Sequence, residues 1–503
     1  MIDNIASALP LVFNYTTLSI IFASALFGLF VGAIPGLSAT MATAILVPIT
    51  FFMDPVPAIA AIVTTAAMAI FASDIPTALL RIPGTAASAA YVNDMNGLAV
   101  KGKVGHALGI SVFCAAFGGI FGSLVLMFTA PKLALVSLNF TSTEYFWLAL
   151  LGLTAAVMLG SGSILKSLLS LGIGLFIATI GLDSTAGHPR FVFGIDAILS
   201  GVAFIPALIG MFAIPEIIRT IVYKDSSEEA PVHVSVRSLF SGLGKTLYKY
   251  KLNMLRGSAI GNAVGILPGA GSDIGSWISY AVSKKMSRYP EKYGSGHDEG
   301  LVDACSANNS SLSGAYVPAM VFGIPGDSIT AIVIGVLYAK GLNPGPLVFI
   351  TKGVEVTAIF ITFLVANLLI IPLGLVAILI SRHLLQVKKS ILIPFILIFA
   401  IAGSYAIDNT YTGIVIMLLL GLLAYFMEEN GLPVAPAILG IVMGPMLESN
   451  LITSLIKSDG NFLEFFSRPI AATLGIITLC IWFMPLLLGL LRKYQNTQRS
   501  GYL

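Results

Sequence analysis

The sequence predicts an all-α protein that crosses a membrane many times. Of its 503 residues, 57% are hydrophobic and only 10% are charged, whereas soluble domains carry about 25% charged residues. Apolar stretches recur from Leu18 to Leu491, and because a spanning helix takes about 20 residues we expect about ten to twelve of them. The stretches are continuous rather than alternating, which favours helices over a β-barrel.

The charged residues are few and lie in short gaps. The formal net charge is +3, and the basic residues form no tract that could follow phosphates, so we expect no nucleic-acid partner. By the positive-inside tendency, the basic gaps face the cytoplasm of a bacterial inner membrane. They are 219–256, Lys284–Asp303, Arg382–Lys389 and the C-terminal tail. The three cysteines lie far apart, which argues against a disulfide framework or a zinc site, and we expect no cofactor.

The two halves of the chain repeat each other. Residues 1–218 are predicted to form a first transmembrane repeat, 219–256 a basic cytoplasmic linker, 257–449 a second repeat, and 450–503 a C-terminal span and tail. Gly28, Gly32, Pro35 and Gly36 recur 233 positions later as Gly261, Gly265, Pro268 and Gly269. Ile75–Thr85 matches Val317–Asp327 at an offset of 242, and PALIG at Pro206 matches PAILG at Pro436. Ordered matches of this kind indicate internal duplication.

Each half begins with a segment that predicts a re-entrant helical hairpin. The segment 257–282 is too short for two spans and is flanked by basic gaps, whereas 18–53 has Asp3 and Asp54 at its ends. The second hairpin is therefore expected to enter from the cytoplasm and the first from outside. Hairpins of opposite orientation predict two inverted repeats, a plan that many secondary transporters use, with an elevator-like motion as a hypothesis.

Four Pro-Gly pairs interrupt apolar sequence and are the strongest functional signal. Proline removes a backbone donor and glycine tolerates φ > 0, so each pair predicts a broken helix whose free backbone groups can bind an anion or a cation. The four GxxxG-type glycines before the hairpin tips are better explained by close helix packing. The predicted substrate-binding residues at and around the breaks are Pro35, Gly36, Ser38, Thr40, Arg81, Pro83, Gly84, Thr85, Ser88, Pro268, Gly269, Pro325 and Gly326.

A run of amides and hydroxyls precedes the fourth break. Asn308, Asn309 and Ser310 offer donors and acceptors without the desolvation cost of a charge, which suits a carboxylate or a cation. We predict that they also bind substrate, although consecutive Asn and Ser residues could instead cap a helix.

Few ionisable groups lie deep in apolar sequence. Asp74, Asp273 and Asp327, with Ser328, are predicted candidates for holding the coupling ion, Na⁺ or H⁺. Helix capping explains Asp273 and Asp327 equally well. Arg81 could bind an anionic substrate in bidentate fashion or simply pair with Asp74.

At these motifs the sequence resembles the TctA family, the large membrane subunit of the tripartite tricarboxylate transporters, over roughly Leu18–Leu490. The resemblance rests on GAIPGLSAT at Gly32, RIPGTAASA at Arg81, VKGKVGHAL at Val100, LPGAGSDIGSWISYAVSKK at Leu267, EGLVDACSANNSSLSGAYVPAMVFGIPGD at Glu299 and KGLNPGP at Lys340. It implies a secondary transporter that imports di- or tricarboxylates with Na⁺ or H⁺. It also implies two partners, a small four-helix membrane subunit and a periplasmic solute-binding protein.

Three places depart from the usual pattern of that family. Asp74 ends a stretch that is commonly rich in glycine and serine, Met95 replaces part of an Asp-Gly-x-Pro segment that keeps Asp94, and Cys305 stands where an acidic residue is frequent. The departures bear on the substrate and the coupling ion. A membrane-embedded enzyme acting on a lipid-linked substrate and a passive anion channel are the alternative functions. An enzyme needs acids or histidines clustered at one membrane face, whereas a transporter needs paired sites related by the repeat.

Overall fold

The computed structural model describes residues 2–159, 163–183, 187–222, 235–268, 271–385 and 389–483, and the chain is helical almost throughout. The helices of the first half are α1 (Ile2–Val12), α2 (Tyr15–Ala33), α3 (Ala39–Thr50), α4 (Pro55–Ala72), α5 (Asp74–Leu80), α6 (Val92–Val100), α7 (Val104–Ser137), α8 (Ser142–Leu159), α9 (Ile164–Ala178) and α10 (Phe204–Val222). Those that follow are α11 (Val236–Phe240), α12 (Leu243–Lys249), α13 (Lys251–Gly265), α14 (Gly271–Met286), α15 (Asp298–Phe322), α16 (Ser328–Ala339), α17 (Val348–Thr351), α18 (Gly353–Leu379), α19 (Ser381–Leu385), α20 (Lys389–Asp408), α21 (Tyr411–Glu429) and α22 (Val434–Lys457).

Short elements complete the described chain. The 3₁₀ helices are η1 (Ser88–Ala90), η2 (Asp196–Ile198), η3 (Pro290–Lys292) and η4 (Phe462–Phe466). Strands β1 (Gly181–Leu182) and β2 (Pro189–Arg190) pair antiparallel, with Gly181 opposite Arg190. The all-α prediction is confirmed apart from this small hairpin of strands.

Seven helices among the described residues are long and apolar enough to cross a membrane. They are Tyr15–Ala33, Pro55–Leu80, Val104–Ser137, Phe204–Val222, Gly353–Leu379, Tyr411–Glu429 and Val434–Lys457. Shorter apolar helices, such as Ser142–Met158 and Pro469–Phe483, accompany them. The chain therefore has the helices of a membrane protein, and the predicted count of ten to twelve spans stays a prediction.

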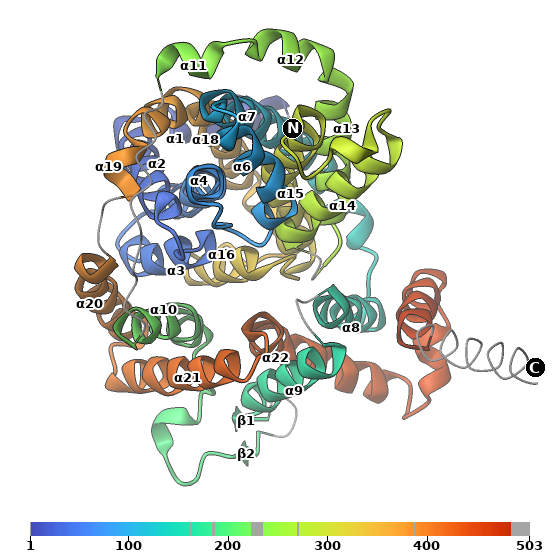
Figure 1. Ribbon diagram of the computed structural model, residues 1–503. Helices are drawn as coiled ribbons and strands as arrows, with labels where there is room; N and C mark the ends of the chain where they lie inside the picture. The colour runs from blue at the N-terminus through green and yellow to red at the C-terminus, as the bar shows by residue number, and fades with distance from the viewer. Residues whose placement is uncertain are drawn as a thin grey trace, which may run out of the picture.

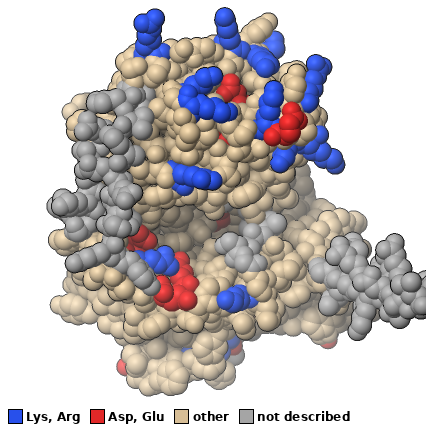
Figure 2. Space-filling view, in the orientation of Figure 1, with Lys and Arg blue, Asp and Glu red and all other residues tan. Residues whose placement is uncertain are grey.

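The helices form two bodies (Figure 1). We call α1–α7, α13–α16 and α18 the hairpin body, and α8–α10 with α20–α22 the outer body. Figure 2 shows the surface hollowed between them. Helices α11 and α12, from the predicted basic linker, lie against the hairpin body, where Figure 2 shows Lys and Arg gathered. Helix α22 continues through residue 449, so the predicted second repeat and the C-terminal segment share this helix.

In the first half, α2 and α3 form a hairpin that packs against α4. A Cβ atom at Gly28 would lie 2.5 Å from the carbonyl oxygen of Thr65, and one at Gly32 would meet the backbone of Ala69. The backbones of α2 and α4 can approach this closely only because no side chain intervenes.

In the second half, α13 and α14 form a hairpin that packs against α15 in the same way. A Cβ atom at Gly261 would meet the carbonyl oxygen of Ala307, and one at Gly265 would meet that of Ser311. Close helix packing, the interpretation favoured for these glycines, is what the structure shows. Each of the two contacts repeats a first-half contact at the offsets of 233 and 242.

In the outer body, helices of each half pack against helices of the other half. Helix α10 packs against α21, where Gly210 meets the backbone of Met417, and α22 packs against α9, where Gly440 meets Leu171 and Leu175. The PALIG and PAILG segments therefore contact helices of the opposite half.

Candidate functional site

The first predicted break separates α2 from α3. Gly36 has φ +86°, a left-handed conformation that a glycine adopts without strain, and it directly follows Pro35. The Ser38 side chain then caps α3 by accepting a hydrogen bond from the backbone N–H of Met41 at 3.1 Å. Thr40 lies in the first turn of α3 and is half-buried. This tip reaches the outer body, because Leu37 and Met41 line a small cavity with Glu216 and other residues of α10 and α20.

The second break follows α5. Arg81 ends that helix at φ 56°, and a Cβ atom at Gly84 would lie 2.7 Å from the carbonyl oxygen of Ser73. Thr85 and Ser88 bind each other, each backbone N–H donating to the other hydroxyl at 3.1 Å. Around this compact turn, Arg81 and Pro83 are exposed.

Arg81 and Asp74 are held by different partners. The Arg81 guanidinium donates to the side-chain oxygen of Asn93 at 2.9 Å at an exposed position, whereas Asp74 is 2% exposed. The interpretation that Arg81 pairs with Asp74 is therefore wrong, because the left-handed turn at Arg81 carries its side chain to the surface.

The third and fourth breaks meet each other. Pro268 lies three residues beyond the end of α13 at Gly265, while Gly269 and the side chain of Asp273 lie outside what the structure describes. Beyond that gap, Gly271 approaches the fourth break, and a Cβ atom there would lie 3.2 Å from the Cβ of Asp327.

The fourth break, between α15 and α16, is buried. Pro325 and Gly326 are enclosed, and a Cβ atom at Gly326 would lie 2.8 Å from that of Ala315. Asp327 forms a capping box with Thr330, the interpretation weighed against ion binding, and Ser328 opens α16. Asp327 therefore both caps α16 and lies close to the tip of the second hairpin.

Asn308, Asn309 and Ser310 lie in the middle of α15 and are buried. Asn309 donates to the carbonyl oxygen of Ala67 at 3.1 Å, and Ser310 donates to that of Ser258 at 2.8 Å. The alternative that these residues cap a helix is wrong, because α15 begins ten residues earlier in the chain, at Asp298. They instead join α15 to α4 and α13.

Asp74 lies at the centre of a buried polar cluster. The Tyr91 hydroxyl donates to its Oδ1 at 2.7 Å, the Ser111 hydroxyl donates to Oδ2, and the Cys305 thiol lies 3.8 Å from Oδ2. Asn308 donates to the Tyr91 oxygen at 3.2 Å. The cluster thus joins a predicted coupling residue to a predicted substrate residue.

Two of the three departures from the TctA pattern are therefore in contact. Asp74 and Cys305 belong to different halves of the chain, and their side chains touch inside the hairpin body. Met95, from the third departure, is buried in the apolar core around this cluster.

Two aromatic contacts were missed by sequence reasoning. Trp277 of α14 donates from its ring nitrogen to the carbonyl oxygen of Ala86 at 2.9 Å, which joins the second hairpin to the second break. Tyr91 reaches across 17 residues to Asp74. Trp277 lies in the LPGAGSDIGSWISYAVSKK segment on which the resemblance rests, but sequence reasoning singled out neither Trp277 nor Tyr91, because their partners depend on how distant segments pack together.

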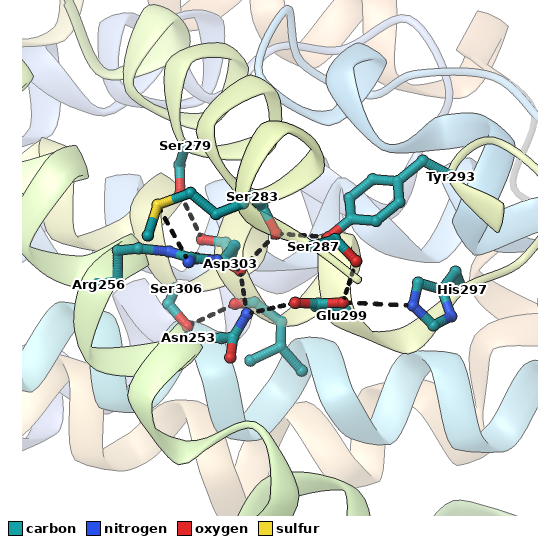
Figure 3. A network of polar contacts seen from close by, with 12 residues as sticks. Asn253, Arg256, Ser279, Ser283, Ser287, Tyr293, His297, Glu299, Asp303 and Ser306 are labelled. Carbon is teal, nitrogen blue, oxygen red and sulfur yellow. Dashed lines mark hydrogen bonds and ion pairs between the residues drawn. The ribbon is translucent and has the colours of Figure 1, made fainter. Parts of the chain in front are cut away.

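A charged network holds the base of the second hairpin (Figure 3). Arg256 of α13 donates to both carboxylate oxygens of Asp303 at 3.0 and 2.6 Å, and Asp303 is 0% exposed. Asn253 and Ser283 donate to the same carboxylate at 2.9 and 2.6 Å. All polar atoms of this carboxylate are therefore satisfied by hairpin residues.

A second carboxylate fastens the loop that follows α14. One oxygen of Asp94 accepts backbone N–H bonds from Gly294, Gly296 and His297 at 2.8, 2.9 and 3.0 Å. The other oxygen accepts from the Tyr280 hydroxyl at 2.6 Å. Asp94, which the resemblance singled out, thus joins α6 of the first half to the polar gap of the second.

Within the described ranges, no three His, Cys, Asp or Glu residues gather as a metal ion would require. The groups of a type suited to an anion are the backbone N–H groups at the breaks and the amides and hydroxyls of α15. In this conformation several of them, including the N–H groups of Thr85 and Ser88 and the hydroxyl of Ser310, donate to other groups of the chain. The carboxyl groups suited to a cation or proton are Asp74 and Asp327.

Comparison with known proteins places the sequence in a family. The model of the tripartite tricarboxylate transporter TctA family matches residues 18–439. The chain is 32% identical over 469 residues to an uncharacterized 52.8 kDa protein in the TAR-I ttuC' 3' region of Agrobacterium vitis, covering 92% of each chain. It is also 34% identical over 222 residues to an uncharacterized protein of the TAR-II ttuC' 3' region of that organism, covering 44% of this chain and 92% of the relative.

No solved structure matches the chain. The family match spans both hairpins and all four breaks, which is most of the sequence. The chain therefore belongs to the tripartite tricarboxylate transporter TctA family, a family of membrane transport proteins.

Proposed function

We propose that this chain is the large subunit of a secondary transporter of the bacterial inner membrane that imports a di- or tricarboxylate together with Na⁺ or H⁺. Its partners would be a small four-helix membrane subunit and a periplasmic solute-binding protein. The observation that carries the proposal is the family match over 18–439, which includes every predicted site residue.

Two inverted repeats are part of this proposal. The matched contacts of Gly28 with Thr65 and of Gly261 with Ala307 support a duplication. The exchanged packing of α10 on α21 and of α22 on α9 supports a two-fold relation between the halves. In inverted-repeat transporters, substrate sites lie at the repeat interface near the bilayer midplane, where broken helices end.

An elevator-like motion fits the division into two bodies. Both hairpin tips touch the outer body, the first at the cavity lined by Leu37 and Met41, and the second where Pro268 approaches Gly152 of α8. Sliding of the hairpin body along these contacts would carry a bound substrate across the membrane without dismantling the site.

We assign the substrate carboxylates to the backbone N–H groups at the breaks and to the side chains of Asn308, Asn309 and Ser310. These groups bind anions through hydrogen bonds and helix-end dipoles rather than through a fixed positive charge. Arg81 is exposed beside the second break, where it can meet an arriving anion.

Uptake of labelled carboxylates into proteoliposomes tests the proposal. The chain is reconstituted with its small subunit and binding protein, and a Na⁺ or pH gradient is imposed. We expect gradient-dependent uptake of at least one di- or tricarboxylate, and no such uptake across a broad carboxylate panel would contradict it. Asn308→Ala and Gly326→Leu should abolish uptake while the protein stays inserted, and unchanged uptake would remove these residues from the site.

The inverted topology has its own test. Single cysteines at Asp54 and Lys284, both exposed, should be labelled by an impermeant thiol reagent from opposite faces of the membrane. Labelling of both from the same face would contradict two hairpins of opposite orientation.

A further inference from the structure

The Asp74 cluster has an unusual composition for a buried carboxylate. All three of its contacting partners are neutral hydrogen donors: the hydroxyls of Tyr91 and Ser111 and the thiol of Cys305. Asp74 is 2% exposed and Tyr91 is 0% exposed, so bulk water does not solvate the carboxyl in this conformation.

No cation of the described chain contacts Asp74. Helices α2 and α4 and the 3₁₀ helix η1, which all pack on α5, carry no Asp, Glu, Lys, Arg, His or Cys. On α6 the ionisable side chain is Asp94, which binds the 294–297 loop.

The ionisable groups of α7 and α15 that come near are also neutral or already paired. On α7, His106 binds Asp298 and the carbonyl oxygen of Ser241, and Cys114 is buried beside α15. On α15, Asp303 is paired with Arg256, and Cys305 is a free thiol.

An ionised carboxyl without a countercharge is costly inside a protein, by several kcal/mol, even when neutral donors surround it. A protonated carboxyl avoids that penalty. The site therefore favours a protonated carboxyl in this conformation, and coupling to a proton gradient requires that another conformation release that proton.

We propose that Asp74 carries the coupling proton of this transporter and that Tyr91 transmits its protonation state to Asn308. The inference rests on the proposed transport function and chooses H⁺ over Na⁺. In the step itself, an O–H bond forms at a carboxyl oxygen of Asp74 with a proton from one side of the membrane, and the same bond breaks to release that proton on the other side.

The hydrogen-bond chain gives the coupling a direction. With Asp74 ionised, the Tyr91 hydroxyl must donate to it, so Tyr91 can only accept from Asn308, whose amide nitrogen lies 3.2 Å away. A protonated Asp74 can instead donate to the Tyr91 oxygen, where it competes with the Asn308 amide for the same acceptor. This competition makes the Asn308 amide hydrogen available to a substrate carboxylate, so proton binding and anion binding support each other.

Proteoliposomes with a pH gradient and no Na⁺ gradient test the inference. Because one pH unit corresponds to 1.36 kcal/mol, each symported proton supports about tenfold carboxylate accumulation per unit of gradient. We expect this of the native chain. Asp74→Asn, which keeps the size of the side chain but fixes it as neutral, should abolish accumulation and remove the pH dependence of carboxylate exchange.

Two further variants protect the test against simple misfolding. Tyr91→Phe keeps the carboxyl and removes the link to Asn308, so it should flatten the pH dependence of carboxylate affinity. The double variant Asp74→Ser with Cys305→Asp moves the carboxyl across the same contact and should regain pH-driven accumulation that Asp74→Ser alone lacks.

Distinct results separate failure of this inference from failure of the proposed function. Accumulation by Asp74→Asn equal to that of the native chain, or native accumulation driven by Na⁺ and indifferent to pH, would overturn the role of Asp74 while leaving carboxylate transport intact. Absence of both accumulation and exchange in the native chain would instead overturn the proposed function.

Discussion

The two hairpins share a plan but are held in the hairpin body by different forces. The first, α2 and α3, has no charged side chain in either helix and rests on α4 through glycine contacts, apolar side chains and a hydrogen bond from the Thr65 hydroxyl to the carbonyl oxygen of Ser24 at 3.3 Å. Directly after α3, Lys340 donates to the carbonyl oxygens of Phe51 and Met53 at 2.8 and 2.6 Å. The second, α13 and α14, has matching glycine contacts and adds the Arg256–Asp303 pair, the Tyr280–Asp94 bond and the Trp277–Ala86 bond. The first hairpin is therefore held by fewer directed bonds than the second, and no ion pair joins its two helices to the rest of the described hairpin body.

This difference indicates which hairpin can move separately from the rest of the hairpin body and open the substrate site. Polar networks fix one geometry, because each bond must be broken before the helices can move. We therefore expect opening at the first tip, with the second hairpin moving only as part of the hairpin body. Amide hydrogen exchange should be slower in α13 and α14 than in α2 and α3.

Removing Arg256 should have the largest effect on this contrast. Arg256→Ala leaves Asp303 buried without its countercharge, and we expect a loss of about 3–5 kcal/mol in stability. A lower melting temperature and faster exchange confined to the second hairpin would show it. The matched double variant Arg256→Met with Asp303→Leu should recover most of the loss, because no unpaired charge remains. If Arg256→Ala were as stable as the native protein, the Arg256–Asp303 pair would not be what holds the second hairpin.

Replacement of Asp94 should cause the second-largest loss of stability. Asp94→Ala leaves three backbone N–H groups and the Tyr280 hydroxyl without an acceptor, and an unsatisfied buried donor costs about 1–3 kcal/mol. Thermal unfolding should report a loss of about 2–4 kcal/mol, since water can replace part of the acceptors. Asp54→Ala is the control, because Asp54 is exposed and its side chain does not cap α4. Equal losses of stability in the two variants would contradict the role of Asp94 in holding the loop after α14.

The matched glycines give a direct comparison between the hairpins. Gly28→Ala and Gly261→Ala each place a methyl group against a backbone carbonyl, and overpacking of this kind costs about 1–3 kcal/mol. We expect the larger loss at Gly261, because its hairpin cannot shift to relieve the contact. A larger loss at Gly28, measured by thermal unfolding in the same detergent, would reverse the assignment of the mobile hairpin.

The smallest expected effect concerns pH. Burial raises the pKa of Asp298, at the start of α15, but hydrogen bonds from His106 and Thr246 outweigh it and leave this pKa below its ordinary value. A carboxyl whose folded pKa is depressed contributes stability that is complete above the unfolded pKa, about 3.9, and is lost as pH falls through the folded value. Asp298→Asn should thus lower stability by about 0.5–1 kcal/mol at pH 7 and hardly at all in strong acid. If Asp298→Asn lost the same stability at pH 7 and in strong acid, the ionised Asp298 carboxylate would not be the source of the stabilisation.

Much of the fold could be predicted from the sequence, because proline and glycine act locally. The tips at Pro35 and Gly36, and the breaks at Pro83 and Pro325, are where the structure interrupts its helices. The contacts of the paired glycines also follow the matched offsets, although the sequence analysis named no partner helix for them. These features depend on a few neighbouring residues, which is why a single sequence reveals them.

The polar cluster could not be predicted, because it depends on how helices from both halves are rotated against each other. Asp74, Ser111 and Cys305 come from three helices, and nothing in their own segments specifies that they meet. Helix α15 is buried from Gly300 to Val321 although it is rich in serine and asparagine, since neighbouring backbone carbonyls satisfy several of these side chains. Hydropathy therefore fails to mark α15 as a central helix.

Accumulation of a labelled carboxylate against its own gradient tests the central claim most directly. Vesicles containing the chain, its small subunit and its binding protein are given a cation gradient, and an ionophore then collapses it. The account predicts an internal carboxylate concentration above the external one that falls back when the gradient is lost. Equilibration without accumulation would indicate a passive channel, and absence of entry would contradict a transport function for this chain.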